Sequence, residues 1–375
     1  MKRVLSIFGT RPEAIKMAPV LRELARHRAV IESVVCVTAQ HRELLDQVLG
    51  LFDIEPDVDL DLMQMNQDPA TFAGRSLGTL SGVLDKVRPD VVLVQGDTTT
   101  AFVASLAAFY ARISVGHVEA GLRTSMLDTP FPEEMHRRLV GRLATWHFAP
   151  TARAVTALQA EGVPAAGIFL TGNPVVDALR WISHRPPAPA TQALLDSLRV
   201  GEMRTILVTA HRRENFGERL EAICDGLAAL IERHRDIQVV FPVHPNPNVR
   251  ETVFGRLAGT PRVHLIEPLP YEAFVHVMAR AWLLLTDSGG LQEEGPVLGK
   301  PVLVLRAETE RPEAVEAGTA KLVGVSATAI VQEVERLVSD RDAYARMAVP
   351  DSPFGDGHAG ERIVRILLER VSSRA

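Results

Sequence analysis

The chain has 375 residues, a length that favours two domains. Hydrophobic residues make up 46% of the chain and charged residues 23%, and the formal net charge of −5 argues against broad attraction to nucleic acid or an anionic membrane. No apolar run approaches the roughly 18 residues that span a bilayer, and the N-terminal apolar run is too short for a signal peptide. We therefore expect a cytoplasmic globular protein with neither nucleic acid nor membrane as a partner.

The two cysteines and the common catalytic motifs exclude several kinds of site. Cys36 and Cys224 each lie in an apolar stretch without a partner at CxxC spacing, so we expect buried, reduced thiols. The sequence contains no Walker A, HExxH or Gly-x-Ser-x-Gly motif, and nothing in it requires a metal or another cofactor.

Short runs rich in Val, Ile and Leu alternate with helical patterns almost from end to end. Strands are predicted at residues 3–9, 32–39, 91–97, 113–120, 146–150 and 168–172, and again at 205–211, 237–245, 263–268, 282–289, 301–306 and 320–325. Segments such as 13–27 and 72–87 have apolar residues at helical spacing. Because several strands are apolar on both faces, we expect two doubly wound α/β units, each with a parallel sheet covered by helices on both sides.

A proline-rich segment marks the predicted border between the units. Pro186, Pro187 and Pro189 lie within residues 183–192 and predict a stiff, extended linker. The expected domains are residues 1–175, joined by a returning C-terminal helix at 359–375, and residues 176–358.

Polar residues crowd at the predicted strand ends of the first half, where open parallel sheets bind ligands. Arg11 follows the first strand and Lys16 lies one helical turn later, so together they can bind an anion. Asp97, Glu119 and Glu133 follow the next strand ends or open a helix, which suggests a carboxylate-rich site that moves protons.

Two of these acids, Asp97 and Glu133, also have a simpler interpretation. Asp97 can cap the helix that follows it. The acids of the FPEE segment can form i,i+4 ion pairs on a helix, Glu133 with Arg137 and Glu134 with Arg138.

The second half carries phosphate-directed motifs at its strand ends. His211 is followed by two arginines, and His244 ends the next strand. Ser288, Gly289 and Gly290 lie between a strand and a helix, which is typical of a backbone cradle for phosphate. Glu294 follows one turn into that helix, where it can accept hydrogen bonds from sugar hydroxyls, and Arg311 offers a further cation at a loop-to-helix junction.

Two literal motif matches are rejected. Residues 355–360 spell GxGxxG, but they follow a proline-containing loop close to the chain end and fail the dinucleotide context. Residues 59–61 spell DxD, yet their alternation favours a short strand.

The ordered set of motifs resembles the non-hydrolysing UDP-N-acetylglucosamine 2-epimerases. The motifs are GTRPEAIKMAP, GDTTT, GHVEAGLRT, FPEE, TGNP, TAHRREN, PVHPNP, TDSGGLQEEGP, GKPVLVLR and TERPEA, and they run from about residue 4 to residue 365. The resemblance implies an α/β protein of the GT-B fold, with two doubly wound Rossmann-like domains, an active site in the cleft between them and a homodimeric assembly.

The resemblance also implies a reaction. Members interconvert UDP-N-acetylglucosamine and UDP-N-acetylmannosamine by eliminating UDP to form 2-acetamidoglucal and then re-adding it, without a nicotinamide cofactor. The product supplies N-acetylmannosamine units for cell-surface polysaccharide. A hydrolysing 2-epimerase that releases UDP and N-acetylmannosamine is the first alternative, a GT-B glycosyltransferase the second, and a non-catalytic sensor of nucleotide sugars the third.

Residue roles follow from the same resemblance. The catalytic candidates are Asp97, Glu119, Glu133 and His211, and which carboxylate takes the proton stays open. The residues implied to bind the nucleotide sugar are Arg11, Lys16, His244, Phe274, Ser288, Gly289, Gly290, Glu294 and Arg311, with His211 also on the diphosphate and Phe274 against the uracil.

Some members of the family bind a second UDP-N-acetylglucosamine as an activator. The matching positions here are Gln40, Glu43, Arg212 and His244. Since Glu43 stands where such members have glutamine, we expect any activation to be weakened or altered.

Overall fold

The computed structural model describes residues 1–39, 42–62, 68–124, 126–128, 130–350 and 352–372, except for the side chains of residues 42–44 and 372. The chain divides into two compact units: unit 1 comprises Met1–Ala178 and Phe354–Ala375, and unit 2 comprises Leu179–Pro353. No helix in the described part of the chain is both long enough and apolar enough to cross a membrane.

Unit 1 is built on a seven-stranded sheet in the order β3-β2-β1-β4-β5-β6-β7. All of its neighbouring strands run parallel. The strands are β1 Lys2–Phe8, β2 Ile31–Val37, β3 Val58–Asp59, β4 Val91–Gln95, β5 Ser114–Val118, β6 Trp146–Ala149 and β7 Ile168–Leu170. The helices are α1 Arg11–Arg26, α2 Arg42–Leu51, α3 Pro69–Val87, α4 Thr99–Tyr110, α5 Glu133–Leu143, α6 Ala152–Ala160, α7 Pro174–Ser183 and α16 Ala359–Ser372.

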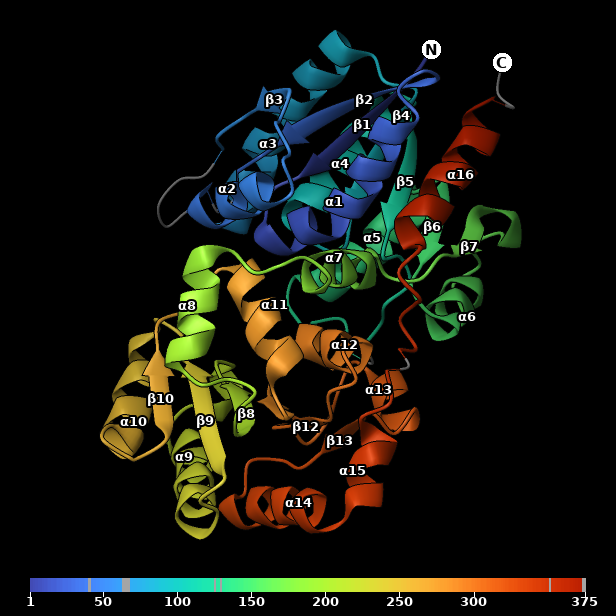
Figure 1. The fold of residues 1–375 in the computed structure, drawn as a ribbon. Helices are drawn as coiled ribbons and strands as arrows, with labels where there is room; N and C mark the ends of the chain where they lie inside the picture. The colour runs from blue at the N-terminus through green and yellow to red at the C-terminus, as the bar shows by residue number, and fades with distance from the viewer. Residues whose placement is uncertain (40–41, 63–67, 125, 129, 351, 373–375) are drawn as a thin grey trace. The chain divides into compact units, whose positions relative to one another are not determined.

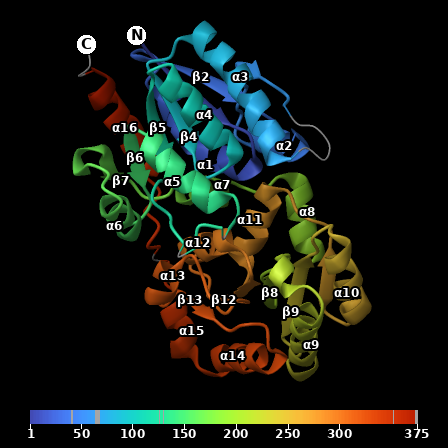
Figure 2. The same cartoon turned by 180° about the vertical axis from the view of Figure 1, so that it is seen from behind.

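Helices cover both faces of this sheet, which is why its strands are apolar throughout. All five residues of β4 are buried. α1 and α16 lie side by side on one face (Figure 1), and α3, α4 and α5 lie on the other (Figure 2). The core on the α3–α5 face contains Leu5 and Ile7 of β1. Val4 and Phe8 on the same strand are equally buried, so β1 is covered on both of its faces.

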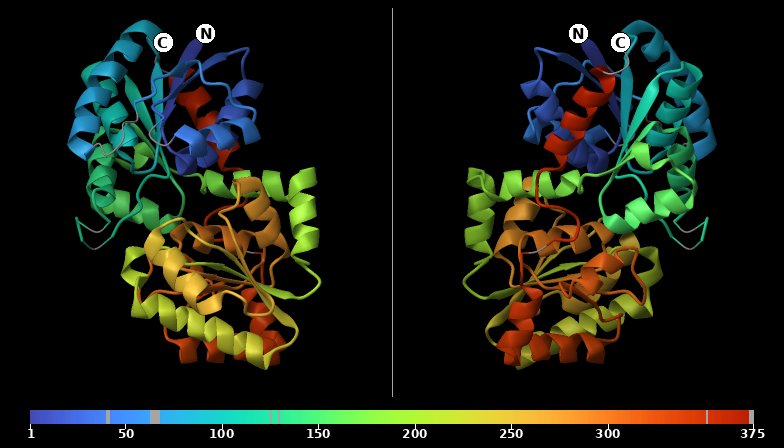
Figure 3. Two further views of the ribbon diagram at one scale, coloured as in Figure 1. Left: turned by 90° about the vertical axis from the view of Figure 1, so that its left-hand side faces the viewer. Right: turned by 90° about the vertical axis from the view of Figure 1, so that its right-hand side faces the viewer.

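Unit 2 repeats the design with a six-stranded parallel sheet in the order β10-β9-β8-β11-β12-β13. The strands are β8 Arg204–Thr209, β9 Ile237–Pro242, β10 Val263–Ile266, β11 Leu283–Thr286, β12 Val302–Val304 and β13 Ala320–Leu322. The helices are α8 Pro189–Ser197, α9 Glu218–Arg233, α10 Pro247–Leu257, α11 Tyr271–Arg280, α12 Gly289–Val297, α13 Pro312–Glu316, α14 Ala327–Ser339 and α15 Arg341–Met347. The strands lie between helices on both sides (Figure 3), and α9, α10 and α14 enclose the larger core.

Counted from the first strand of each unit, both sheets have the strand order 3-2-1-4-5-6 of doubly wound folds, with a seventh strand in unit 1. The predicted α/β fold class is therefore confirmed, with a Rossmann-like arrangement in each unit. The short strand expected near residues 59–61 exists as β3. The GxGxxG match runs from a loop into the first two residues of α16, and the element before that loop is a helix and not a strand.

The expectation of an extended linker at residues 183–192 is wrong in part. α7 continues to Ser183 and Pro189 is the first residue of α8, so only residues 184–188 lie outside a helix within the proline-rich stretch. Proline suits this position because the first helical N–H has no intrahelical partner to lose.

The C-terminal segment returns to the chain that leaves β7. The Gly172 and Gly355 backbones lie so close that a Cβ on either would sit 3.1–3.2 Å from the other residue's Cα, and both have positive φ, so both positions require glycine. Beyond this crossing, Asp177 accepts a hydrogen bond from the Gly360 N–H at 2.8 Å at the start of α16.

Candidate active site

The carboxyl ends of β1, β4 and β5 are neighbours in the unit 1 sheet, so the loops that follow them meet at one edge. These loops and the helices after them carry most of the predicted site residues of the first half. Three of them make charge-assisted hydrogen bonds in the structure, Lys16 with Glu119 and Asp97 with Arg137.

Glu119 lies at the centre of this cluster. Its carboxylate accepts hydrogen bonds from Lys16 Nζ at 2.6 and 2.7 Å, from Asn173 Nδ2 at 2.9 Å, and from the Gln95 side-chain amide. The residue is 6% exposed, and its φ of +63° is the left-handed conformation, which carries strain in a non-glycine residue. Donors from three other segments of unit 1 therefore hold this carboxylate in a single orientation.

Asp97 lies in the turn between β4 and α4. Its Oδ2 accepts a hydrogen bond from Arg137 Nε at 2.8 Å, and its carbonyl oxygen lies 2.9 Å from His136 Nδ1. The helix-cap interpretation is wrong, because Thr98 caps α4 by accepting a hydrogen bond from the Ala101 N–H. Among the described residues, Asp97 Oδ1 has no hydrogen-bond partner, so it is available to a ligand.

Glu133 opens α5 and is half-buried. The expected pair with Arg137 is not formed, because Arg137 binds Asp97 and Glu134 instead, whereas the expected pair of Glu134 with Arg138 is present at 3.0 Å. Within the described part of the chain, Glu133 has no ion pair. It lies one helical turn before His136 and Arg137, which contact Asp97.

The two predicted cations of the first loop have different surroundings. Lys16 forms an ion pair with Glu119, so its positive charge balances a carboxylate of the same site. Arg11 is the first residue of α1, is half-buried, and has no partner among the described residues. Arg11 is therefore the free cation of this loop.

In unit 2 the loops after β8, β9 and β11 form the second cluster. The His211 and His244 rings stack with centroids 5.5 Å apart and planes inclined by 18°. Desolvation and the neighbouring His211 lower the pKa of His244. His244 Nδ1 also accepts a hydrogen bond from the Asn246 N–H, so the neutral ring carries its proton on Nε2.

The Ser288-Gly289-Gly290 turn opens α12 as predicted. Ser288 is the N-cap residue, but its hydroxyl makes no capping hydrogen bond, and the two glycines leave the first backbone N–H groups of α12 uncovered. Gly290 is exposed, and the side chains of Ser288 and Arg212 lie within 4 Å of where Cβ atoms would stand on the two glycines. This turn can cradle an anion.

The predicted sugar and uracil contacts lie on α12 and α11. Glu294 is 8% exposed and accepts a hydrogen bond from Tyr271 Oη at 2.7 Å. Phe274 is half-buried on α11, one turn beyond Tyr271.

Arg311 is less free than the sequence suggested. It is 8% exposed, its Nε donates to Glu293, and its Nη1 donates to the Glu310 carbonyl oxygen at 3.2 Å. Its charge is therefore already balanced by Glu293.

The predicted effector residues are only partly described. Gln40 lies outside the described residues, as does the side chain of Glu43 on α2. Arg212 Nη1 lies 3.7 Å from Glu310 Oε1, and its backbone N–H donates to Asp287. His244 belongs to the histidine pair described above.

Several residues of the two clusters were not predicted as site residues. They are Glu13, Gln95, Glu134, His136, Arg137, Asn173, Tyr271, Asp287 and Glu293. Asn173 and Asp287 stand within the TGNP and TDSGG motifs, which was the available signal, whereas Tyr271 is found only through its contact with Glu294. Among the described residues, no group of three or more His, Cys, Asp or Glu side chains is placed to hold a metal ion.

Comparison with known proteins gives matches over almost the whole chain. A family model described as UDP-N-acetylglucosamine 2-epimerase matches residues 22–368. The UDP-N-acetylglucosamine 2-epimerase of Yersinia pestis is 53% identical over 369 residues, which are 97% of this chain and 98% of the relative. The protein of the same name from Escherichia coli K12 is 52% identical over 371 residues, 97% of this chain and 98% of the relative.

Solved structures give the same result. The crystal structure of UDP-GlcNAc 2-epimerase from Neisseria meningitidis bound to UDP-GlcNAc is 46% identical, covers 98% of this chain and 100% of its own, and has a TM-score of 0.88. The Methanocaldococcus jannaschii enzyme in complex with UDP-GlcNAc and UDP is 35% identical, with the same coverage and a TM-score of 0.82.

Proposed function

Since this chain belongs to the UDP-N-acetylglucosamine 2-epimerase family, we propose that it interconverts UDP-N-acetylglucosamine and UDP-N-acetylmannosamine by inverting carbon 2 of the sugar without hydrolysis. The observation that carries the proposal is that two kinds of group lie in different units. Unit 1 contains carboxylates suited to acid/base catalysis, and unit 2 contains groups suited to binding an anion.

The proposed reaction proceeds by elimination, because the hydrogen on carbon 2 is not adjacent to a carbonyl and is not acidic enough to be removed while the bond from carbon 1 to UDP stays intact. A carboxylate takes that proton, the electron pair forms the double bond between carbons 1 and 2, and the bond from carbon 1 to UDP breaks. UDP leaves with its electron pair, and 2-acetamidoglucal remains. In the reverse sense, a UDP oxygen bonds to carbon 1 and a proton is delivered to the other face of carbon 2.

In unit 1 we assign the proton transfers to carboxylates with unoccupied oxygens. Asp97 keeps Oδ1 free while Arg137 holds Oδ2, and Glu133 has no ion pair in the described part of the chain. Glu119 is bound by three neighbouring side chains, so its proposed part is to order the site and to present Lys16 beside it.

In unit 2 we assign the groups that hold the leaving UDP. The Ser288 turn and the two stacked histidines offer backbone N–H groups, a hydroxyl and imidazole N–H groups to the diphosphate. Glu294, oriented by Tyr271, accepts from ribose hydroxyls, and Phe274 packs against the uracil.

The proposed cellular setting is the cytoplasm, where the product would supply N-acetylmannosamine units for cell-surface polysaccharide. Both cysteines support a reducing compartment, since Cys36 and Cys224 are buried free thiols. Burial raises the pKa of each thiol to about 12, which keeps both unreactive.

One experiment tests the function against its alternatives. UDP-N-acetylglucosamine is incubated with the protein in heavy water and followed by proton NMR. The proposal requires UDP-N-acetylmannosamine with deuterium at carbon 2. Accumulation of free N-acetylmannosamine would identify a hydrolysing enzyme, and absence of turnover until a sugar acceptor is added would identify a glycosyltransferase.

Asp97→Asn is the sharpest single variant for this proposal. The amide oxygen can still accept from Arg137 Nε, but the side chain no longer takes a proton, so turnover should fall by a factor of at least ~100 while UDP still binds. Asp68→Asn, the same charge change at an exposed helix cap, is the matched control. Turnover within threefold of the unmodified protein would remove Asp97 from the acid/base set.

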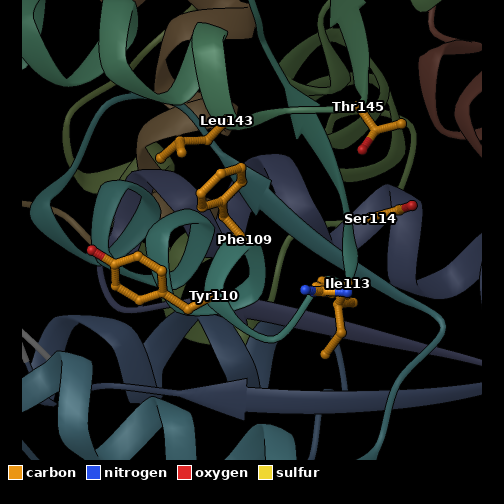
Figure 4. Close-up of a pocket in the computed structure, with 7 residues that line it drawn as sticks. Phe109, Tyr110, Ile113, Ser114, Leu143 and Thr145 are labelled. Atoms are coloured by element: carbon orange, nitrogen blue, oxygen red, sulfur yellow. The ribbon is translucent and has the colours of Figure 1, made fainter.

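The assembly we propose is a homodimer that covers an apolar patch on α4 and α5. Phe109 and Tyr110 are 57% and 67% exposed, and Met135 and Leu139 on α5 are also exposed. Figure 4 shows Phe109, Tyr110 and Leu143 around an adjoining pocket of about 650 Å³. A second copy of the chain is the occupant that this patch would accept.

Replacing Phe109 and Tyr110 together by lysine places like charges on both copies at this patch. Sedimentation should then give a monomer, whereas the proposal requires twice the mass of one chain for the unmodified protein. Leu170→Lys, at a 57% exposed leucine on β7, should leave the dimer intact. A dimer that survives the double substitution would place the interface elsewhere.

A further inference from the structure

Asp287 is a completely buried carboxylate at the end of β11 whose two oxygens have unequal surroundings. Oδ2 accepts three hydrogen bonds, from the N–H groups of His211 at 2.8 Å and Arg212 at 2.9 Å and from Asn215 Nδ2 at 3.0 Å. Oδ1 is buried and has no hydrogen-bond partner among the described residues. An unsatisfied buried carboxylate oxygen is costly, so a donor is expected to turn toward it.

The group beside Oδ1 is the imidazole of His211. Its Nδ1 lies 3.4 Å from Asp287 Oδ1, slightly longer than an ordinary hydrogen bond, as is common for such pairs before a ligand binds. The ring cannot turn freely, because it stacks on His244 and its backbone N–H is bonded to the same carboxylate. Nδ1 is therefore the ring nitrogen that faces the Asp287 carboxylate.

The two stacked rings thus have different tautomers. His244 Nδ1 accepts the Asn246 N–H, which leaves the proton of that ring on Nε2. A carboxylate accepts and does not donate, so His211 must hold its proton on Nδ1 when the ring is neutral.

We propose that Asp287 is a positioning residue that keeps a proton on His211 Nδ1 and thereby makes His211 Nε2 the nitrogen that meets the ligand. When a diphosphate binds, Nε2 takes a second proton from solvent and donates to a phosphate oxygen. The buried carboxylate balances the imidazolium charge. That the ligand is a nucleoside diphosphate rests on the proposed function, whereas the tautomer does not.

The test reads the tautomer directly by NMR. The protein is prepared with ¹⁵N-labelled histidine, and long-range proton–nitrogen spectra at pH 8 distinguish an Nδ1–H ring from an Nε2–H ring. His211→Gln identifies the His211 signals among the 12 histidines. The proposal requires the Nδ1–H form in the unmodified protein, and an Nε2–H form there would overturn it.

Asp287→Asn should reverse the tautomer without removing the acceptor. The amide oxygen can replace Oδ2 toward its three donors, which turns the NH2 group toward His211 Nδ1 and moves the ring proton to Nε2. UDP should then bind at least tenfold more weakly by calorimetry, because no buried carboxylate balances the imidazolium that meets the diphosphate. Asp225→Asn, on the surface of α9 and paired with Arg256, should change neither spectrum nor affinity.

A double variant separates positioning from general damage. If Asp287 acts through His211, Asp287→Asn should weaken UDP binding less than twofold when His211 is already glutamine. An equal loss in both backgrounds would overturn the proposal, and if Asp287→Asn does not fold, the spectrum of the unmodified protein decides. Because these measurements need no turnover, a protein with the Nδ1–H tautomer but no epimerisation in heavy water would contradict only the proposed function.

Discussion

Glu13 is a buried carboxyl that connects the turn after β1 to the turn after β4. Its Oε2 accepts from the N–H groups of Gly9 and Thr10 and from the Thr10 hydroxyl, and its Oε1 accepts from the Thr98 hydroxyl at 2.7 Å. Burial raises its pKa to about 7, and these hydrogen bonds only partly oppose the rise. Because Thr98 follows Asp97, Glu13 also supports the loop that carries a catalytic candidate.

This raised pKa makes the stability of the protein depend on pH. The folded state binds the Glu13 proton more tightly than the unfolded chain, so the stabilisation is complete below pH 4.5 and is lost as the pH rises through about 7. Glu13→Gln keeps an acceptor for the three donors and an N–H for Thr98, and it does not ionise. Denaturant unfolding should therefore show the variant gaining about 2–3 kcal/mol relative to the unmodified protein between pH 5 and pH 8.

The exposed Glu55→Gln serves as the control for this pH series. A difference between Glu13→Gln and the unmodified protein that stays constant from pH 5 to pH 8 would show that Glu13 is ionised throughout that range. The raised pKa would then be wrong.

Single residues also show where sequence reasoning reached its limit. Asp97 and Glu119 could be selected because acids are unusual at the end of a buried strand, and the structure places them after the neighbouring strands β4 and β5. The partners of these acids could not be selected, since Arg137 is 40 positions from Asp97 and Asn173 is 54 positions from Glu119. Local spacing predicted the pair of Glu133 with Arg137, but a distant carboxylate binds Arg137 instead.

At the scale of elements, the strands were predictable because a sheet covered on both faces needs apolar residues at every position. Loops and the first residues of helices were less predictable from the sequence. Pro189 fits an extended linker and the first turn of a helix equally well. Burial of the Thr191 and Leu195 side chains, which lie one turn apart, favours the helix.

The start of α16 depends on a residue from another helix. Asp177 of α7 accepts from the Gly360 N–H at 2.8 Å, and burial raises the pKa of this carboxyl to about 6. The returning helix is thus held to unit 1 by a capping bond that joins residues 183 positions apart, in addition to its packing on α1.

Asp177→Ala should loosen this attachment. The Gly360 N–H loses its acceptor in a buried setting, so unfolding should cost about 1–2 kcal/mol less, and the first turn of α16 should exchange amide hydrogen faster. Asp177→Asn keeps an acceptor oxygen and should lose less than half as much. Equal losses in the two variants would mean that the charge of Asp177, rather than its hydrogen bond, holds α16.

For the whole molecule, the proposed reaction assigns different tasks to the two units. In that proposal Asp97 and Glu133 of unit 1 transfer the protons, and the Ser288 turn of unit 2 binds the diphosphate. A ligand that lacks the sugar should therefore find its direct contacts in unit 2.

Hydrogen exchange with UDP tests this division, since direct contacts protect the amides of the binding loops. UDP alone should slow exchange most at residues 288–291 and 211–215, by a factor of about 10 or more, because the first N–H groups of α12 then donate to phosphate. The turn after β4 at residues 96–98 should change less than the unit 2 loops.

Arg233→Ala on the outer surface of α9 is the control and should leave the pattern unchanged. Arg212→Ala is not suitable, because Arg212 lies at the site. If UDP protected residues 96–98 as strongly as residues 288–291, the diphosphate would contact unit 1 directly, and the assignment of UDP binding to unit 2 would have to be shared with Arg11.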